Sequence, residues 1–201
     1  MKTFIVCLLT IGILACGQPA AAVTLDFEGL TDLESVTSQF TGLTFEKTVA
    51  LVSGAVGGSL NEIDFPPHSG VTVVADDSGA ITITFDSPVA SVSGFFTYSA
   101  ALTLTAFDAL LATVDTTTSA FGANTASGGD GGSSPNELLS VDAVSGITSL
   151  KIETADGGSV VLDDLTFVPL AVPEPRMLES LLCATAALLA VAARQRWARA
   201  V

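Results

Sequence analysis

Short stretches in which apolar and polar residues alternate limit what the middle of this 201-residue chain can fold into. In AITITFD (residues 80–86), isoleucine or phenylalanine alternates with threonine. A period of two residues is typical of a β-strand with one buried face, because successive side chains leave a strand on opposite sides. We therefore expect half-buried strands here rather than helices.

The same pattern recurs along most of the chain, between turns rich in Gly, Asp and Ser. The other predicted strands are VTLDF, TGLTFEK, GVTVVAD, VASVSGFFTYS, ALTLTAFD, LLATVDTTT, ELLSVDA, ITSLKIETA and SVVLDDLTF. No stretch between residues 23 and 167 has a convincing helical period. About ten strands in a body of this size predict an all-β fold, an antiparallel β-sandwich of jelly-roll-like type.

Two predicted loops interrupt the strands. GANTASGGDGGSSPNE (residues 122–137) is too rich in Gly and Ser to become ordered cheaply, so we expect it to hang at one end of the body. SLNEIDFPPHSG (residues 59–70) carries Phe65 and the chain's only histidine, His68.

Charge and cysteine content exclude several classes of function for the body, residues 23–170. Its only basic residues are Lys47 and Lys151, whereas nearly all of the chain's 21 Asp and Glu lie within it. Nucleic acid is excluded as a partner, because binding it requires a basic surface. The three cysteines, Cys7, Cys16 and Cys183, lie outside the body, which excludes a disulfide, a zinc–cysteine site and a cysteine nucleophile there.

The N-terminus is typical of an exported protein. Lys2 precedes an uncharged run that continues to about Ala15, and small residues follow up to residue 22. This order predicts a secretory signal peptide, residues 1–22, with cleavage after Ala22. An alternative takes Ile13-Leu14-Ala15-Cys16 as a lipobox, in which Cys16 would be acylated.

The C-terminus combines a stiff spacer, an apolar segment and a basic end. Pro173 and Pro175 fix their own backbone angles, so no helix or sheet can absorb them. A helix over residues 177–193 would rise ~1.5 Å per residue and span ~26 Å, slightly less than the ~30 Å of a bilayer core. Three arginines follow it and would stay on the cytoplasmic side: Arg194, Arg196 and Arg199. The alternative is an ordinary helix that closes the domain.

This order of parts resembles the PEP-CTERM sorting signal, here residues 171–201. The motif itself is Val172-Pro173-Glu174-Pro175. The resemblance implies processing by exosortase in Gram-negative bacteria that make exopolysaccharide or biofilm. It implies a precursor anchored in the inner membrane with its body in the periplasm, and then a place at the cell surface or in the extracellular matrix. Arg176 and Glu179 depart from the family pattern, and both would shift the membrane boundary.

The body also resembles that of many PEP-CTERM proteins, in the order of phrases from DFEGL through PPHSG to VLDDLTF. That body is often compared with carbohydrate-binding jelly rolls, whose first strand often contains Phe-Glu and whose last contains Asp-Asp, together binding calcium. The resemblance thus implies a calcium site made by Asp26, Glu28, Asp163 and Asp164. Carboxylate oxygens are the ligands that calcium prefers. Alternatively, the first two face solvent and the last two occupy a strand-end turn.

Catalytic motifs are weak. His68 lies in a predicted turn, so a Ser-His-Asp triad is not expected. Acids are plentiful, but no carboxylate pair for glycoside hydrolysis can be identified from the sequence. The body has no tryptophan, and alternation with Phe96 predicts that Tyr98 is buried, which leaves Phe65 and Phe121 as candidate sugar platforms or as loop anchors.

We therefore predict an exported, non-enzymatic surface or matrix protein. The alternative is a calcium-dependent carbohydrate-binding module of the exopolysaccharide matrix.

Overall fold

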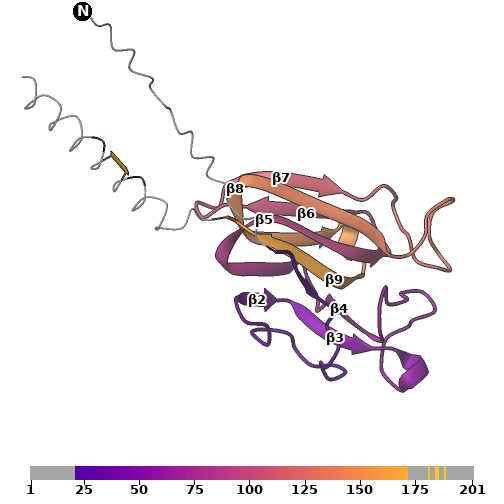
Figure 1. Ribbon diagram of the computed structural model, residues 1–201. Coiled ribbons are helices and arrows are strands. Elements are labelled where there is room, and N and C mark those ends of the chain that lie inside the picture. The colour runs from indigo at the N-terminus through magenta and orange to yellow at the C-terminus, as the bar shows by residue number, and fades with distance from the viewer. Residues whose placement is uncertain (1–20, 172–180, 182–183, 186–187, 189–201) are drawn as a thin grey trace, which may run out of the picture. The chain divides into compact units, whose positions relative to one another are not determined.

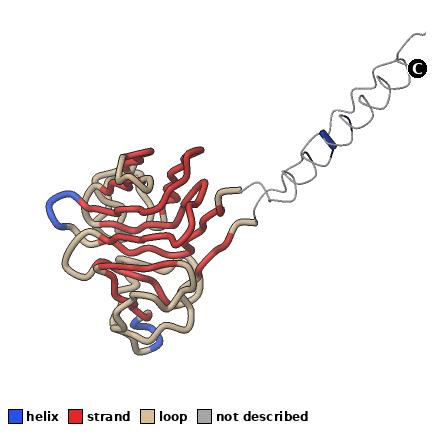
Figure 2. The backbone as a smooth tube through the Cα atoms, turned by 90° about the vertical axis from the view of Figure 1, so that its left-hand side faces the viewer, coloured by secondary structure: helices blue, strands red, loops and turns tan. Residues whose placement is uncertain are grey.

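The computed structural model describes residues 21–171 together with residues 181, 184, 185 and 188. The described body, part of the compact unit Ala20–Leu170, has nine strands and two short 3-10 turns (Figures 1 and 2). The strands are β1 (Val23–Leu25), β2 (Leu43–Glu46), β3 (Thr48–Val52), β4 (Thr72–Asp76), β5 (Ile81–Tyr98), β6 (Leu102–Phe107), β7 (Thr113–Thr118), β8 (Glu137–Thr154) and β9 (Val160–Pro169). The turns are η1 (Gly54–Val56) and η2 (Ala155–Gly157). Paired strands run antiparallel, which confirms the β-sandwich class.

The two long strands β5 and β8 link the two layers of the sandwich. Their pairing shifts register between Thr84 and Val89, and residues 86–88 are exposed there. Pro88 lies in this interval, and a proline cannot donate an N–H to a neighbouring strand. Each long strand therefore contributes one half to each layer.

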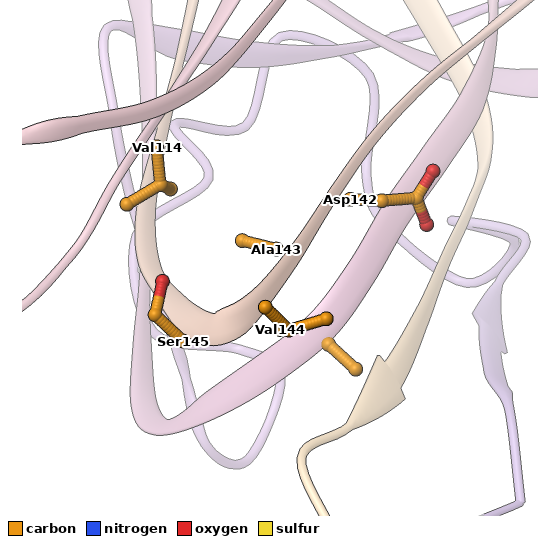
Figure 3. Close-up of a pocket in the computed structure, with 6 residues that line it drawn as sticks. Val114, Asp142, Ala143, Val144 and Ser145 are labelled. Atoms are coloured by element: carbon orange, nitrogen blue, oxygen red, sulfur yellow. The ribbon is translucent and has the colours of Figure 1, made fainter.

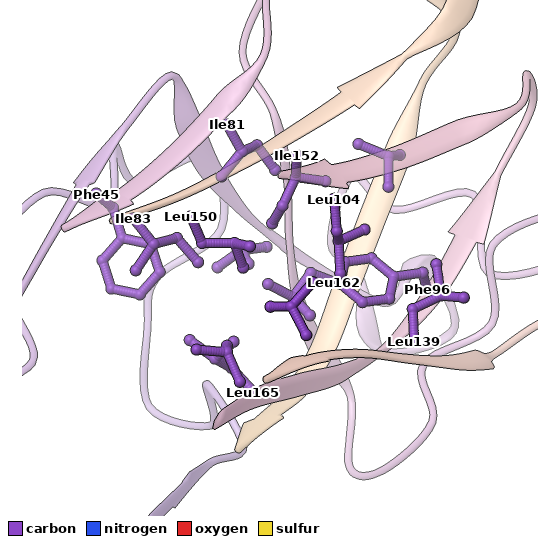
Figure 4. Close-up of a cluster of buried hydrophobic side chains, with 14 of the residues drawn as sticks. Phe45, Ile81, Ile83, Phe96, Leu104, Leu139, Leu150, Ile152, Leu162 and Leu165 are labelled. Atoms are coloured by element: carbon purple, nitrogen blue, oxygen red, sulfur yellow. The ribbon is translucent and has the colours of Figure 1, made fainter. Parts of the chain in front are cut away.

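Strand pairing defines both layers. The first contains β2, the first half of β5, the second half of β8, β6 and β7. The second contains the other halves of β5 and β8, then β9, β4 and β3, with β1 paired to the far part of β9. Alternating residues of both layers fill the core between them (Figure 4), and these include Phe45, Ile83, Phe96, Leu150 and Leu162, each at most 1% exposed.

The strand predictions differ from the structure in two ways. AITITFD and VASVSGFFTYS form the single strand β5, and ELLSVDA and ITSLKIETA form the single strand β8. The strand β3, TVALV, was not predicted, because its burial does not alternate between a core face and a solvent face. Its side chains at residues 49 and 51 are partly covered by a second apolar cluster on the outer side of the sheet.

The loop at residues 122–137 lies at one end of the body, as predicted (Figure 1), but it is ordered by specific hydrogen bonds, which its composition did not indicate. Asn124 is fully buried, and its Oδ1 accepts a hydrogen bond from the Tyr98 N–H at 2.7 Å. Its Nδ2 donates to the Phe96 carbonyl at 2.9 Å, and the Gly122 N–H donates to Asp130 Oδ2 at 2.7 Å. The side chain of Asn124 thus links the loop to backbone groups at the end of β5.

Several predictions concern residues outside the described part. They are the signal segment up to residue 20, the Val172–Pro175 motif, most of the predicted membrane helix and the three terminal arginines. Residues 181, 184, 185 and 188 are helical. Within the described residues, no helix combines the length and the hydropathy needed to cross a bilayer.

Candidate functional site

The first and last strands of the body are neighbours, as the calcium hypothesis required. Leu25 of β1 pairs with Leu165 of β9. Asp26 and Glu28 follow the first of these residues, and Asp163 and Asp164 precede the second. The antiparallel pairing therefore brings both acidic pairs to the same part of the sheet.

Glu28 holds the segment that leads into β4. Its Oε1 accepts hydrogen bonds from the backbone N–H groups of Val71 and Thr72, both at 2.8 Å. The same oxygen lies against Gly70, where a Cβ atom would come within 2.2 Å of it. Gly70 also has a φ of +54°, so this close approach requires a glycine for two reasons.

A β-bulge aims two adjacent carboxylates at the same segment. Ser93 of β5 pairs with Thr166 and Phe95 with Asp163, so β9 has one extra residue there, and Asp164 has a φ of +47°. Adjacent side chains of a regular strand would point to opposite faces, and a bulge re-aims one of them. Asp163 lies inside β9, so the strand-end turn of the alternative interpretation is not found.

The two aspartates bind consecutive residues. Asp163 Oδ2 accepts from the N–H groups of His68 and Ser69, both at 2.8 Å. Asp164 Oδ1 accepts from the Ser69 hydroxyl at 2.9 Å, and its Oδ2 lies 2.6 Å from His68 Nδ1. We call residues 66–72, held by Glu28 and by these two aspartates, the clamped loop.

His68 has structural partners on both sides. Its ring stacks on Phe95 with the centroids 3.4 Å apart and the planes 7° from parallel. The side chain of His68 is 38% exposed, and that of its partner Asp164 is 16% exposed. Ser69 donates its hydroxyl to Asp164 rather than to the imidazole, so these three residues are not arranged as a catalytic triad.

The electrostatics of the clamped loop centre on Asp163, which is 1% exposed. Burial raises the pKa of Asp163 to about 6, because a carboxylate loses hydration there, while the N–H groups of Ser69 and Asp164 oppose the shift. Asp26 does not join the other three acids on the clamped loop. Its Oδ1 accepts from the N–H of Glu28 at 3.1 Å.

The calcium hypothesis receives no direct support from this geometry. Among the described residues, no group of three or more His, Cys, Asp or Glu side chains is placed to hold a metal ion. The oxygens of Glu28, Asp163 and Asp164 instead accept bonds from the clamped loop. Calcium binding stays a prediction from the sequence.

Phe65, which directly precedes the clamped loop, lines a pocket of about 230 Å³. The apolar lining comes from the outer face of β3, β4 and β9 and from the loop after β3. The lining residues are Val49, Leu51, Leu60, Asn61, Phe65, Ala75, Asp76, Ser159, Val160 and Val161. We call it the Phe65 pocket. A polar pocket of about 290 Å³ shares Asp76 with it and is lined further by Ser78, Gly79, Ala80, Glu153, Thr154, Gly157 and Gly158.

The other predicted aromatic positions differ from Phe65. Phe121 is half-buried after β7, its carbonyl accepts from the Ser119 hydroxyl at 2.8 Å, and it lines neither of these two pockets. Tyr98 is fully buried, which confirms the prediction, and its hydroxyl donates to Glu137. Burial and this carboxylate raise the pKa of Tyr98 to about 12.

A larger pocket, about 410 Å³, lies at the corner of β8 (Figure 3). Its lining has no aromatic side chain and only one charged side chain, Asp142. Val144 stands exposed at its edge. The Phe65 pocket is smaller, but it alone of the pockets described here joins an aromatic side chain to polar groups.

Sequence reasoning missed Phe95, Gly70 and Asn124. The PPHSG phrase signalled a turn, but nothing in it indicated the stacking partner of His68, which lies far away in sequence. Asn124 lay hidden within a stretch whose composition is typical of a flexible loop.

No known family model matches the chain, and no curated protein matches it. Among solved structures, the chain is similar to a cleaved adhesin domain of Lys-gingipain, with 16% identity, a TM-score of 0.47, and coverage of 73% of this chain and 97% of that one. A second such domain, from Porphyromonas gingivalis, is 10% identical with a TM-score of 0.43 and the same coverage.

A variant of the family 29 carbohydrate-binding module CBM29-2 is also similar, with 10% identity, a TM-score of 0.38, and coverage of 74% of this chain and 92% of that one. At these TM-scores the likeness assigns neither a ligand nor an activity to this chain.

Proposed function

We propose that this chain is an exported, non-enzymatic surface or matrix protein that is made as a membrane-tethered precursor and passed to exosortase. One observation carries the proposal: a signal-like start and a Pro-Glu-Pro, apolar and Arg-rich end enclose a single β-sandwich body. If the protein were an enzyme, its body would need side chains that are free to act on a substrate. The carboxylates of Glu28 and Asp163 instead accept bonds from backbone N–H groups of the clamped loop, and the imidazole of His68 is paired with Asp164.

The body suits display on a tether. Val23 pairs with Phe167, so both ends of the body emerge at the same end of β9. The Phe65 pocket lies at the other end of β9, near Ser159 and Val160. Ten strand residues separate the two ends by ~30 Å. Within the body, the Phe65 pocket and Leu170 therefore lie at opposite ends of β9.

Cell fractionation tests the sorting proposal. The full chain is expressed in an exosortase-positive host and in the same host lacking exosortase, beside a variant with Pro173, Glu174 and Pro175 changed to alanine. We expect a shorter, released product only from the unaltered chain in the first host. Products of equal size and equal solubility in all three samples would contradict the proposal.

A calcium-dependent carbohydrate-binding module is the second candidate. The observation that favours carbohydrate binding is the Phe65 pocket, which joins an aromatic side chain to polar groups. Its calcium dependence is what the sequence resemblance implies for Asp26, Glu28, Asp163 and Asp164. A ligand that binds only the folded state raises the melting temperature. We therefore expect a chelator to lower the melting temperature of the full chain, and Glu28→Gln to remove that response. A melting curve that chelator leaves unchanged would reject calcium.

A further inference from the structure

The outer face of the second layer carries a row of apolar side chains. Val49 of β3 pairs with Ala75 of β4, which in turn pairs with Val161 of β9. The neighbouring residues Val74 and Leu162 also pair, and they point into the main core. The row therefore lies on the side of the sheet that, in an antiparallel sandwich, normally faces water and carries polar residues.

The loop after β3 covers this row only in part. Leu60 is 4% exposed and joins Val73, Ala75 and Val161 in a second apolar cluster, against which Phe65 packs from the side. The space that remains is the Phe65 pocket. An apolar concavity of this kind is typical of a binding site for a small molecule.

The loop that shapes the pocket is fixed before any ligand arrives. The Leu60 N–H donates to the Val52 carbonyl at 2.9 Å, and Asp32 accepts bonds from Val52 and Ser59. At Gly58 a Cβ atom would lie 2.1 Å from the Val52 carbonyl oxygen, so only glycine allows the loop to turn back there. Downstream, the clamped loop fixes the chain just after Phe65. A preorganised site loses little entropy on binding.

Polar groups stand at the rim of this apolar floor. Asn61 Nδ2 donates to Asp64 at 2.8 Å, an orientation that leaves the amide oxygen available to accept. Asp76 Oδ1 accepts from the Val160 N–H at 2.8 Å, and its Oδ2 has no hydrogen-bond partner among the described residues. Of the described residues that line the pocket, none is basic. These groups favour a ligand that offers hydroxyl donors and carries no negative charge.

We propose that the Phe65 pocket binds a neutral sugar ring of a polysaccharide, with the C–H face of the ring on Phe65 and its hydroxyls on Asn61 and Asp76. A pyranose ring combines an apolar face with donor hydroxyls at its edge, which matches an aromatic wall and acceptor rim. The pocket is smaller than the roughly 300–1,000 Å³ of sites for drug-sized ligands, so it holds a single ring.

The polar pocket across Asp76 receives the next ring of the same chain. It is lined by Glu153, Thr154 and the glycine-rich turns on either side, so it offers mainly hydroxyl, carboxylate and backbone groups. Two adjoining sites predict that affinity rises with chain length and that a single sugar binds weakly. This inference extends the carbohydrate-binding candidate above, does not require calcium, and is independent of sorting.

Titration calorimetry tests the proposal with the full chain in a detergent that lacks sugar headgroups. The probes are neutral glucose-, mannose- and galactose-based oligosaccharides of increasing length, beside polygalacturonate as an anionic counterpart. The variants are Phe65→Ala and Asp76→Asn. Their matched controls are Phe121→Ala, which removes the other candidate platform, and Asp77→Asn, which removes the adjacent charge. The melting temperature of each variant verifies that it has folded.

We expect saturable binding of at least one neutral series, stronger for longer chains and absent for polygalacturonate. Phe65→Ala and Asp76→Asn should each weaken it about tenfold or more, as the loss of a stacking or hydrogen-bonding contact does. Both controls should leave it unchanged. If no neutral series binds, or if binding survives both pocket variants, the proposal is wrong. Sorting is measured by fractionation, so such a failure leaves that proposal standing.

Discussion

The two outer faces of the sandwich differ in how they meet water. Across the first layer, Thr82 pairs with Lys151, Lys151 with Thr105, and Thr105 with Thr116. A neighbouring row pairs Thr44 with Thr84. Across the second layer, the corresponding row is Val49, Ala75 and Val161.

This contrast explains where loops are needed. The threonine face carries short polar side chains that are stable in contact with water, and no loop has to cover it. The valine–alanine face would expose apolar surface. The segment between β3 and β4, residues 53–71, covers part of this face, and carboxylates hold that segment in place. Because this segment does not cover the whole face, the Phe65 pocket remains between them. A pocket of this kind can bind a ligand specifically.

The largest predicted effect on stability comes from comparing one substitution on each outer face. Val161→Asp places a charge at a position that is 5% exposed and has no basic neighbour in the pocket lining. We expect the free energy of unfolding to fall by about 3–5 kcal/mol. Thr105→Asp, directly opposite Lys151, should cost no more than about 1 kcal/mol. Chemical denaturation measures both, and equal losses would show that the two faces do not differ in this way.

Asp163, which accepts hydrogen bonds from the clamped loop, should make the stability of the protein depend on pH, with a smaller effect. The pKa of Asp163 in the folded protein, about 6, lies above its ordinary value of 3.8, so the folded state binds the proton more tightly. The resulting stabilisation is complete below pH 3.8 and is lost as the pH rises through about 6. It amounts to at most about 3 kcal/mol.

Relative to Asp163→Asn, the unaltered chain should therefore gain stability as the pH falls through this window. Both proteins keep every other side chain that contacts the clamped loop, so the difference between the two profiles reports on Asp163. Asp77→Asn controls for the loss of a negative charge. Parallel profiles for the unaltered chain and Asp163→Asn would contradict the assignment.

Much of the sandwich could be predicted from alternation alone. In ITITF (residues 81–85) and LTLTA (residues 102–106), the apolar residues are buried and the threonines lie on the outer face, as their period of two requires. The strand β3 could not be predicted in this way, because TVALV is covered on both faces, and the cover by Leu60 and Phe65 depends on how the following loop folds back over the strand.

The candidate site was only partly predictable. The calcium hypothesis required the first and last strands to be neighbours, and β1 does pair with β9. Phe65 was named for its aromatic ring and its loop. The β-bulge at Asp164 could not be foreseen, because the local sequence indicates neither the positive φ of this aspartate nor its bond to Ser69. The stack of His68 on Phe95 joins the clamped loop to β5, and no local pattern in either segment indicates that contact.

The most direct test of this account is the location of a bound sugar on the two faces. Amide NMR spectra of the isotopically labelled full chain, titrated with the neutral oligosaccharide of highest affinity, would report this. We expect the largest shifts at residues 61, 65, 75, 76 and 161, further shifts at residues 79 and 153 of the polar pocket, and none at Thr105 or Thr116. Shifts on the threonine face, or a spectrum that does not change at saturating sugar, would contradict the claim that the covered apolar face is the binding surface.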